Sequence, residues 1–336
     1  MAAVFNNILI VRTDAIGDLI LSEPVAQVIK SQYPKCRISF LVSDYSAPVL
    51  HNNKNVDEVI SMPRQYFKFN TTNLFKITRI LKSNNYDAVV VLRPTLFNAI
   101  AVYLSNIPVR IGTGYRLYSV LFNKRKYEHR SDNTKNEMYY NLSLLENLGI
   151  SDEEIPEDIK PEISIIDNEI ESSRMMLLEK GIKGNDIPII IHPGGRDSAP
   201  KWPLDKYIEL IGKLSELPGV KVILTGTDDE FNSEEMKKLE AHRKIYINLI
   251  GKLDLRRFMS LISVARLTVT NSTGTAHIAA ALGVPLVAIY QDSSDISLLR
   301  WTPVGIAGKM SILYSEDVES ITTDKVYSSC RGFLEN

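Results

Sequence analysis

The stretch LTVTNSTGTAHIAAALGVPLVAIY, residues 267–290, decides the fold class. Its β-branched, apolar ends predict strands over Leu267–Thr270 and Leu286–Tyr290, and the small apolar residues between them predict a helix that includes Ile278–Leu282. Two strands joined through a helix run parallel in one sheet. The stretch therefore predicts an α/β protein in which helices cover a parallel sheet.

The same alternation continues through the rest of the 336 residues and forms two series, each typical of a doubly wound domain. The first series predicts strands over Ile8–Val11, Arg37–Val42, Val56–Ile60, Ala88–Leu92 and Val109–Ile111, with helices near Pro24–Gln32, Leu74–Lys82, Leu96–Leu104 and Glu137–Leu148. The second series predicts, ahead of the quoted stretch, strands over Ile189–His192, Val220–Thr225 and Ile245–Leu249. Beyond about residue 320 the polar sequence leaves two alternatives, a tail that packs back and a frayed end.

An acidic segment, Gly149–Ile166, separates the two series. It contains Pro156 and Pro161, which interrupt regular elements and suit an interdomain linker. The chain length also suits two domains of about 150 residues each. We therefore predict one domain over residues 1–160 and a second over residues 161–336.

The composition indicates a soluble, cytoplasmic protein. A net charge of −1 provides no overall attraction to nucleic acid, so no nucleic-acid partner is expected. The two cysteines, Cys36 and Cys330, have no partner at metal-binding spacing and fit a reducing compartment. No run approaches the roughly 18 apolar residues of a membrane span. Any membrane contact is therefore expected to be peripheral, at the inner face of the cytoplasmic membrane.

The first candidate site follows the first strand, in the sequence Arg12-Thr13-Asp14-Ala15-Ile16-Gly17-Asp18. Gly17 permits a tight turn, and Asp18 lies where the strand is followed by a helix, at the ligand-binding edge of the sheet. A carboxylate there can accept a proton from a substrate hydroxyl, which typically contributes ~10²–10⁴-fold to a rate. The alternative is that Asp14 or Asp18 caps the helix.

The second candidate site is the sequence HPGGRDSAPKWP, residues 192–203, between a strand and a helix. Gly194 and Gly195 let backbone amides approach an anion, and Arg196 and Lys201 can neutralise phosphate charge. The sequence lacks the Gly-Lys-Ser/Thr ending of a P-loop. The alternative is a surface turn with incidental charges.

The third candidate site is the polar turn within the quoted stretch. It places Ser272, Thr273, Gly274 and Thr275, followed by His277, at the start of an apolar helix. A helix N-terminus offers free amides and the positive end of the helix dipole to a phosphate. The alternative is ordinary capping by Ser or Thr, which can coexist with phosphate binding.

Two weaker candidates follow neighbouring strands. Glu230, in the loop after Val220–Thr225, could hold ribose hydroxyls, and Lys252 could contact a base or a phosphate. The alternatives are a solvated loop for Glu230 and a plain strand-to-helix turn for Lys252. A metal or nicotinamide cofactor is not expected, because the five histidines lack ligand spacing, no Asp-x-Asp pair occurs, and Gly112-Thr113-Gly114 is not a dinucleotide fingerprint.

One basic and aromatic region stands apart from these loops. It comprises Arg64–Phe69, the nearby Lys76, Arg79 and Lys82, and Lys124–Tyr127. Such a region suits an anionic lipid headgroup or a sugar phosphate acceptor. The alternative is a solvated charged face.

Taken in order, these motifs resemble glycosyltransferase family 9, the lipopolysaccharide heptosyltransferases. The resemblance covers about Asn7 to Pro303. It is carried by Ile8–Asp18 with Pro24, by His192-Pro193-Gly194-Gly195 with Lys201-Trp202-Pro203, and by Ser272-Thr273-Gly274 with the sequence from His277 to Pro285.

The resemblance implies a GT-B architecture, two Rossmann-like domains facing across a cleft, with the acceptor on the first domain and the nucleotide sugar on the second. It implies an inverting transfer with Asp18 as catalytic base. Lys201 would steady the donor phosphates, the turn around Gly274 would bind the diphosphate, and Glu230 would contact the ribose. The expected partners are ADP-heptose and a lipopolysaccharide core or related glycan.

Ser272 stands where users of ADP-heptose often have an acidic residue. Two alternatives therefore stay open beside a heptosyltransferase. One is a family relative that uses a different nucleotide sugar. The other is a catalytically silent subunit that binds a nucleotide sugar.

Overall fold

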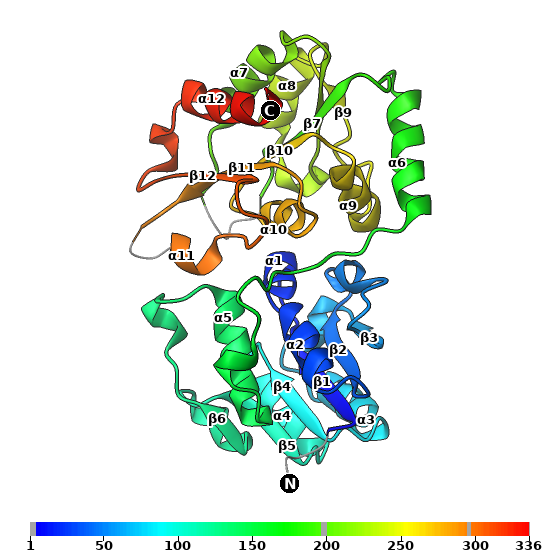
Figure 1. Cartoon of the computed structure of the whole chain (residues 1–336), viewed down its shortest axis with the longest axis vertical. Coiled ribbons are helices and arrows are strands. Elements are labelled where there is room, and N and C mark those ends of the chain that lie inside the picture. The colour runs from blue at the N-terminus through cyan, green and yellow to red at the C-terminus, as the bar shows by residue number, and fades with distance from the viewer. Residues whose placement is uncertain (1–4, 196–199, 294–296, 336) are drawn as a thin grey trace. The chain divides into compact units, whose positions relative to one another are not determined.

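The computed structural model describes residues 5–195, 200–293 and 297–335 (Figure 1). The chain divides into two compact units, Met1–Glu162 and Ile163–Asn336. The boundary predicted after residue 160 lies two residues before this division.

The first unit contains a parallel sheet with the strand order β3-β2-β1-β4-β5-β6. The strands are β1 (Asn7–Val11), β2 (Arg37–Ser43), β3 (Glu58–Met62), β4 (Ala88–Val91), β5 (Val109–Thr113) and β6 (Lys124–Lys126). The central strand β1 pairs with both β2 and β4, and Val11 lies beside Leu41 and Val91. The chain leaves β1 and β4 in opposite directions, which opens a crevice at their carboxyl ends.

Helices cover both faces of this sheet. The α-helices are α1 (Ile16–Ile20), α2 (Pro24–Gln32), α3 (Thr71–Ser83), α4 (Leu96–Leu104) and α5 (Glu137–Leu142), and the 3₁₀ helices are η1 (Ala47–Leu50), η2 (Arg64–Phe67), η3 (Leu117–Leu121), η4 (Arg130–Asp132), η5 (Ser143–Leu148) and η6 (Asp152–Glu154). The elements α3, α4, η2 and η3 share one core with Leu9, Val11, Val89 and Val91. In Figure 1, α2 and α5 lie in front of the strands, and the two helices contact each other.

The second unit repeats this plan with the strand order β12-β11-β10-β7-β8-β9. Its strands are β7 (Ile187–His192), β8 (Val220–Leu224), β9 (Ile247–Asn248), β10 (Leu267–Asn271), β11 (Leu286–Gln291) and β12 (Met310–Ser315). Its helices are α6 (Asp167–Glu179), α7 (Leu204–Ser215), α8 (Ser233–Ala241), α9 (Leu255–Ser263), α10 (Gly274–Ala281), α11 (Leu298–Trp301) and α12 (Thr323–Leu334), with the 3₁₀ helices η7 (Asp228–Glu230) and η8 (Val318–Ser320). The crevice of this sheet lies where β7 and β10 pair.

The predicted fold class is confirmed. The structure differs from the prediction in the edge strands of both sheets, in one divided helix and in the C-terminal segment. The edge strands β6 and β12 were not predicted, because the sequence Lys-Arg-Lys of β6 and the half-buried β12 give a weak alternation signal. The predicted helix Glu137–Leu148 divides into α5 and the 3₁₀ helix η5. Helix α12 packs on α7 with Val326 and Cys330 in the core, so the tail packs back rather than frays.

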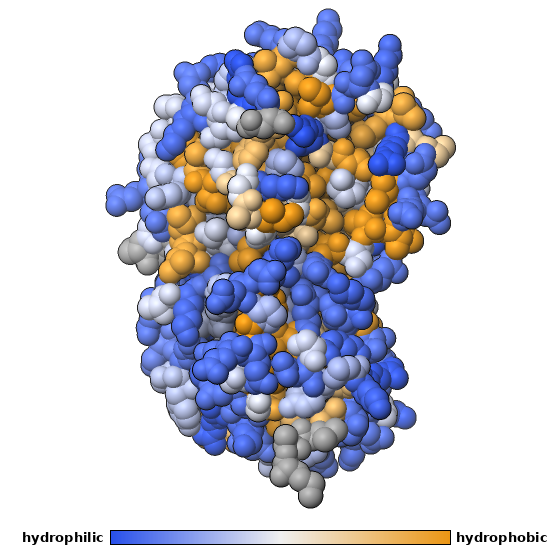
Figure 2. All heavy atoms as spheres, viewed as in Figure 1, coloured by the Kyte–Doolittle hydropathy of each residue, from blue (hydrophilic) through white to orange (hydrophobic). Residues whose placement is uncertain are grey.

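The two units differ in surface character on the face shown in Figure 2. The visible surface of the first unit is mostly hydrophilic, whereas apolar side chains gather over α6 of the second unit. Met175 and Leu178 of α6 are both more than half exposed. No helix in the described part of the chain is long and apolar enough to span a membrane.

Candidate active site

A buried arginine organises the loop after β1. The side chain of Arg12 is 3% exposed, and its guanidinium contacts three carboxylates. Nε donates to Asp14 Oδ1 at 2.8 Å, Nη1 donates to Glu137 Oε1 at 3.0 Å, and Nη2 donates to Asp18 Oδ1. The predicted base Asp18 is therefore held by a cation that also holds its two acidic neighbours.

Further guanidinium groups complete this charge cluster. Arg130 Nη1 donates to Glu137 Oε1 at 2.5 Å and to Asn141 Oδ1 at 3.0 Å. Arg93, from the loop after β4, donates to the Thr13 carbonyl at 2.9 Å and places Nε 3.7 Å from Asp14 Oδ2. Cations and carboxylates thus alternate at the carboxyl end of the central strands.

No role for Arg12, Glu137 or Arg130 was predicted from the sequence. The one local signal was a basic residue directly after a buried central strand. An arginine in that position is rarely buried unless carboxylates surround it.

Burial and charge act in opposite directions within this cluster. Burial and the neighbouring Asp18 carboxylate raise the pKa of Asp14, while Arg12 and Arg93 lower it, and the net shift is upward. Burial disfavours the charge of Arg12, but the carboxylates of Asp14, Asp18 and Glu137 outweigh it and raise its pKa. Arg12 therefore stays protonated throughout the working pH range.

The alternative in which an aspartate caps the helix and the expectation of a tight turn at Gly17 are both wrong. Helix α1 begins after Ala15, which provides no side-chain cap, and both Asp14 and Asp18 contact Arg12 instead of capping α1. Gly17 lies inside α1 and not in a tight turn, because the helix starts as soon as the chain leaves the sheet edge.

In the second unit, His192 ends β7 and joins two neighbouring loops. Its Nδ1 lies 3.1 Å from Thr225 Oγ1, and its ring lies 5.2 Å from the ring of Phe258. Its Nε2 lies 3.7 Å from Glu230 Oε2, which forms an ion pair when His192 is protonated. A Cβ added to Gly194 would lie 2.5 Å from the same Glu230 oxygen. A glycine at position 194 therefore lets the loop pass this carboxylate.

Glu230 is part of an ordered turn and not of a solvated loop. Its Oε2 accepts the backbone amide of Thr227 at 2.7 Å. Burial raises the pKa of Glu230, but the hydrogen bonds and charge of His192 and the hydrogen bonds of Thr227 outweigh burial and lower the pKa to about 2. The carboxylate is therefore ionised at neutral pH and can accept hydrogen bonds from a ligand.

The loops after β7 and β10 meet at Gly195. A Cβ added to Gly195 would lie 3.2 Å from Thr273 Cγ2 and 3.5 Å from Lys201 Cδ. These three predicted residues come together although Lys201 and Thr273 belong to different loops.

Asn271, the last residue of β10, ties these loops together. It is buried, and its Oδ1 accepts the Trp202 amide and the Tyr207 hydroxyl, both at 3.0 Å. Its Nδ2 donates to the Pro193 carbonyl at 2.7 Å. Asn271 was not predicted from the sequence, where its one signal is a polar amide at the end of a largely apolar strand.

The N-terminus of α10 carries the third motif. Thr273 is the N-cap and accepts the amide of Thr275 at 3.3 Å, so the capping interpretation is confirmed for Thr273. Ser272 precedes the cap, Gly274 begins the helix, and His277 is buried within it. The amide of Ala276 donates to the Thr273 carbonyl at 3.1 Å, so Gly274 is the residue of the first turn whose amide an anion could use.

The remaining predicted residues are less closely connected. Lys252 is exposed, and its Nζ donates to the Asn248 carbonyl at 2.8 Å. The preceding Gly251 has a φ of +68°, and a Cβ there would lie 2.4 Å from Asp228 Oδ1, so the loops after β8 and β9 adjoin. Arg196 lies outside the described residues.

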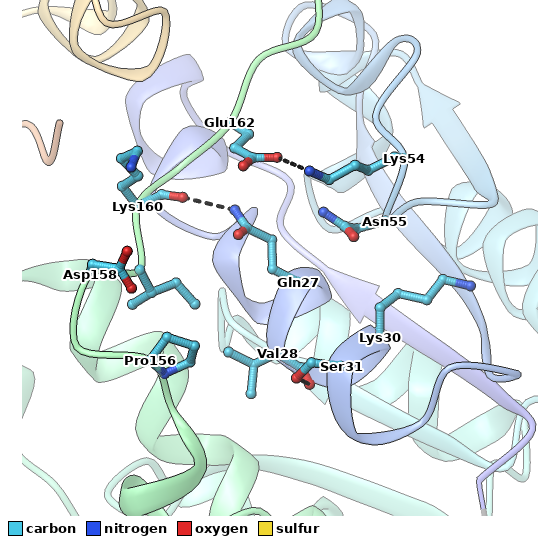
Figure 3. A pocket seen from close by; sticks show the side chains of 11 residues that line it. Gln27, Val28, Lys30, Ser31, Lys54, Asn55, Pro156, Asp158, Lys160 and Glu162 are labelled. Atoms are coloured by element: carbon cyan, nitrogen blue, oxygen red, sulfur yellow. Dashed lines mark hydrogen bonds and ion pairs between the residues drawn. The ribbon is translucent and has the colours of Figure 1, made fainter. Parts of the chain in front are cut away.

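A pocket of about 440 Å³ lies elsewhere in the first unit, between α2 and the segment that leads to the second unit (Figure 3). Gln27 donates to the Lys160 carbonyl at 2.8 Å, and Lys54 pairs with Glu162 at 3.0 Å. Beneath them the buried Glu23 accepts Gln27, Asn53 and the Glu162 amide. No predicted site residue lines this pocket, so it belongs to the attachment of the linker.

Within the described residues, no group of three His, Cys, Asp or Glu side chains is arranged to hold a metal ion. Two groups of residues are instead suited to bind a ligand, the charge cluster around Arg12 and the glycine-rich loops around Lys201. Both lie at the carboxyl ends of central strands, where parallel sheets bind ligands.

The chain is similar to known glycosyltransferases in sequence. The family model described as glycosyltransferase family 9 (heptosyltransferase) matches residues 74–318, a range that leaves out Asp18. Lipooligosaccharide heptosyltransferase 2 of Haemophilus influenzae is 28% identical over 88% of this chain and 85% of its own.

Two solved structures share the fold. One is that of E. coli ADP-heptose lps heptosyltransferase II, with a TM-score of 0.82, 22% identity and 98% of both chains covered. The other is that of E. coli heptosyltransferase WaaC with ADP, with a TM-score of 0.75, 18% identity, and 97% of this chain and 99% of that chain covered. The chain therefore belongs to glycosyltransferase family 9 and has the α/β GT-B architecture of that family.

Proposed function

We propose that this glycosyltransferase moves a heptose from ADP-heptose to a lipopolysaccharide core or a related surface glycan, with inversion at the anomeric carbon. The observation that carries the proposal is the meeting of Gly195, Lys201 and Thr273 beside the N-terminus of α10. A cation beside the positive end of a helix dipole, at one sheet edge, suits a diphosphate. A neighbour of the same fold was solved with ADP.

In this proposal the second unit binds the donor. Lys201 and the N-terminus of α10 stabilise the negative charge that develops on the departing nucleoside diphosphate, with Ser272, Gly274 and Thr275 around it. The ionised Glu230 accepts hydrogen bonds from ribose hydroxyls. Gly194 keeps the loop close to Glu230, His277 supports the helix from within, and Lys252 and Arg196 supply further positive charge.

The first unit supplies the base. Asp18 accepts the proton of an acceptor hydroxyl while its oxygen bonds to the anomeric carbon, and the bond between that carbon and the diphosphate oxygen breaks on the opposite side. Arg12 occupies Asp18 Oδ1 and leaves Oδ2 for the hydroxyl. We propose that no metal is required, so that a chelator leaves the rate unchanged.

We further propose that the protein meets its acceptor at the cytoplasmic side of the inner membrane by peripheral contact. The relatives' names refer to lipopolysaccharide and lipooligosaccharide, which are lipid-anchored glycans. The basic residues of the first unit suit the phosphates of such an acceptor.

Thermal unfolding with ADP, UDP, GDP and CDP tests the donor, because a ligand that binds the folded state raises its stability. We expect selective stabilisation by ADP. Selective stabilisation by another nucleotide would keep the chemistry and replace the donor, which the departure at Ser272 leaves as the second candidate. Stabilisation by none of them would contradict a nucleotide site that is formed in the absence of the acceptor.

A turnover assay then distinguishes a transferase from a silent binding subunit. Purified protein with ADP-heptose and a core acceptor is expected to release ADP only when both are present. Binding of ADP without release of ADP in that assay would contradict the proposed activity.

A further inference from the structure

One stretch of the first unit is strongly basic although the whole chain has a net charge of −1. Residues 63–127 contain a single acidic residue, Asp87, whose carboxylate accepts the backbone amides of Asn6 and Asn7. The same stretch contains eleven basic residues, which are Arg64, Lys68, Lys76, Arg79, Lys82, Arg93, Arg110, Arg116, Lys124, Arg125 and Lys126. Segregation of this size sets up a local positive field.

The fold brings much of this stretch into one layer. Side chains of η2, α3, α4 and η3 enter the same core on one face of the sheet, so the opposite sides of these elements form a common outer surface. We call this surface the basic layer. Eight exposed cations lie on these elements, on the residues next to them or on the edge strand β6. They are Arg64, Lys68, Lys76, Arg79, Lys82, Arg116, Lys124 and Arg125. Across residues 5–195, 200–293 and 297–335, none of these eight forms an ion pair.

Large apolar side chains stand among these cations. Leu117 is 97% exposed and Val120 is 70% exposed, both in η3, and Phe75 of α3 is 70% exposed. The guanidinium of Arg110 lies 5.4 Å from the ring of the exposed Tyr103, and its Nε donates to the Leu121 carbonyl at 2.9 Å, which ties α4 to η3. Several exposed apolar side chains that stand together and are bordered by cations are typical of a surface that binds a partner or a membrane.

We propose that the basic layer docks on an anionic lipid bilayer, with Leu117 and Val120 entering the acyl boundary and the surrounding lysines and arginines meeting lipid phosphates. Anionic bilayers attract such cations, and apolar side chains anchor them. This docking rests on the proposed function, which already includes a peripheral membrane contact, and it names the surface that makes that contact. Because docking needs neither donor nor acceptor sugar, an experiment can contradict docking without contradicting sugar transfer, and the reverse.

Sedimentation with vesicles tests the docking surface. The full chain is expected to bind phosphatidylcholine vesicles that contain about one third phosphatidylglycerol, and to bind pure phosphatidylcholine at least about tenfold more weakly. Raising the salt concentration should release it. Equal binding to both vesicles, or binding that ignores salt, would overturn the electrostatic part of the proposal.

Matched variants locate the contact. The double substitution Leu117→Asp, Val120→Asp is expected to weaken vesicle binding at least about tenfold, because both apolar anchors are lost and two like charges are added. Leu178→Asp is the control, since Leu178 is 59% exposed on the acidic helix α6 and should have no effect. An equal loss in both proteins, or in neither, would overturn the assignment.

Charge reversal gives a second comparison. Lys76→Glu with Arg79→Glu on α3 should weaken binding at low salt, whereas Lys237→Glu on α8 of the second unit should not. Thermal stabilisation by ADP should be the same in all these variants as in the parent protein. That result would show that the variants are folded and that their donor site is intact.

Hydrogen exchange separates the bilayer from the acceptor glycan. Vesicles are expected to protect residues 115–121, and a soluble phosphorylated core oligosaccharide is not. Protection of this segment by the oligosaccharide alone would assign the basic layer to acceptor recognition and overturn docking. Loss of sugar transfer with vesicle binding intact would instead count against the proposed activity.

Discussion

The two units share one sheet topology but hold their central loops by different forces. Counted within each unit, both sheets have the strand order 3-2-1-4-5-6. In the first unit the loop after the central strand is held by buried charges around Arg12. In the second unit the corresponding loop after β7 is held by the neutral hydrogen bonds of Asn271 and by close passage at Gly194.

This difference shows how one fold can serve two chemical tasks. In the proposed function, a cluster rich in carboxylates provides a proton acceptor, and its buried cation keeps the carboxylates in place. In the same proposal, a loop with two glycines and Lys201 offers backbone amides and positive charge to an anion. The sheet supplies the position, and the residues after its strands supply the chemistry.

The largest expected effect is on the proton acceptor. Asp18→Asn should lower kcat by about 10²–10⁴-fold, because the amide cannot accept the hydroxyl proton, while stabilisation by ADP stays unchanged. Steady-state release of ADP measures this effect. Asp14→Asn is the matched control, and a larger loss in that variant than in Asp18→Asn would move the base to Asp14.

The next effect is on stability in the first unit. Arg12→Ala leaves three neighbouring carboxylates without their central cation and should lower the free energy of unfolding by about 3–5 kcal/mol. Urea unfolding measures the change. Arg12→Lys retains the charge but not the forked contacts and should lose less. Equal stability of Arg12→Ala and the parent protein would mean that the cluster is not organised by this arginine.

A smaller loss is expected for the neutral counterpart in the second unit. Asn271→Ala removes the partners of Trp202, Tyr207 and Pro193 and should lower the free energy of unfolding by about 1–3 kcal/mol, with weaker stabilisation by ADP. Urea unfolding and the ADP thermal shift measure the two changes. If Asn271→Ala cost as much stability as Arg12→Ala, the contrast between charged and neutral loops would not hold.

The smallest effect is the pH dependence supplied by Glu230. Its pKa is lowered from 4.5 to about 2 in the folded protein, so its contribution to stability is fully present above pH 4.5 and is lost as the pH falls toward 2. The stability difference between the parent protein and Glu230→Gln should therefore shrink over that range. Urea unfolding at several acidic pH values measures it, and a difference that is constant with pH would contradict the shift.

The strands and the positions of the candidate loops could be predicted because their signals are local. Alternation of β-branched runs with helical patterns locates β1, β7 and β10, and glycines after two of those strands mark turns that approach a ligand. Thr273 was recognisable as a helix cap for the same reason. The edge strand β6 was not predicted, because a run of three basic residues shows no alternation of polar and apolar side chains.

The contacts that organise the site depend on residues far apart in the chain. Arg12 meets Glu137 across 125 positions, and Asn271 meets Trp202 across 69. No local pattern relates such partners, because they become neighbours only after the sheet aligns its strands. Asp18 lies only six positions from Arg12, but the guanidinium is fixed between these carboxylates by its distant contact with Glu137.

Sequence alone was sufficient for the α/β class, the two series of strands and the order of the motifs, because hydrophobic period and turn chemistry act over a few residues. The tertiary structure alone decided which carboxylates surround Arg12, which loops meet at Gly195, and which cations and apolar side chains share the basic layer. Those relations depend on strand order and burial, and both arise only when distant segments pack together.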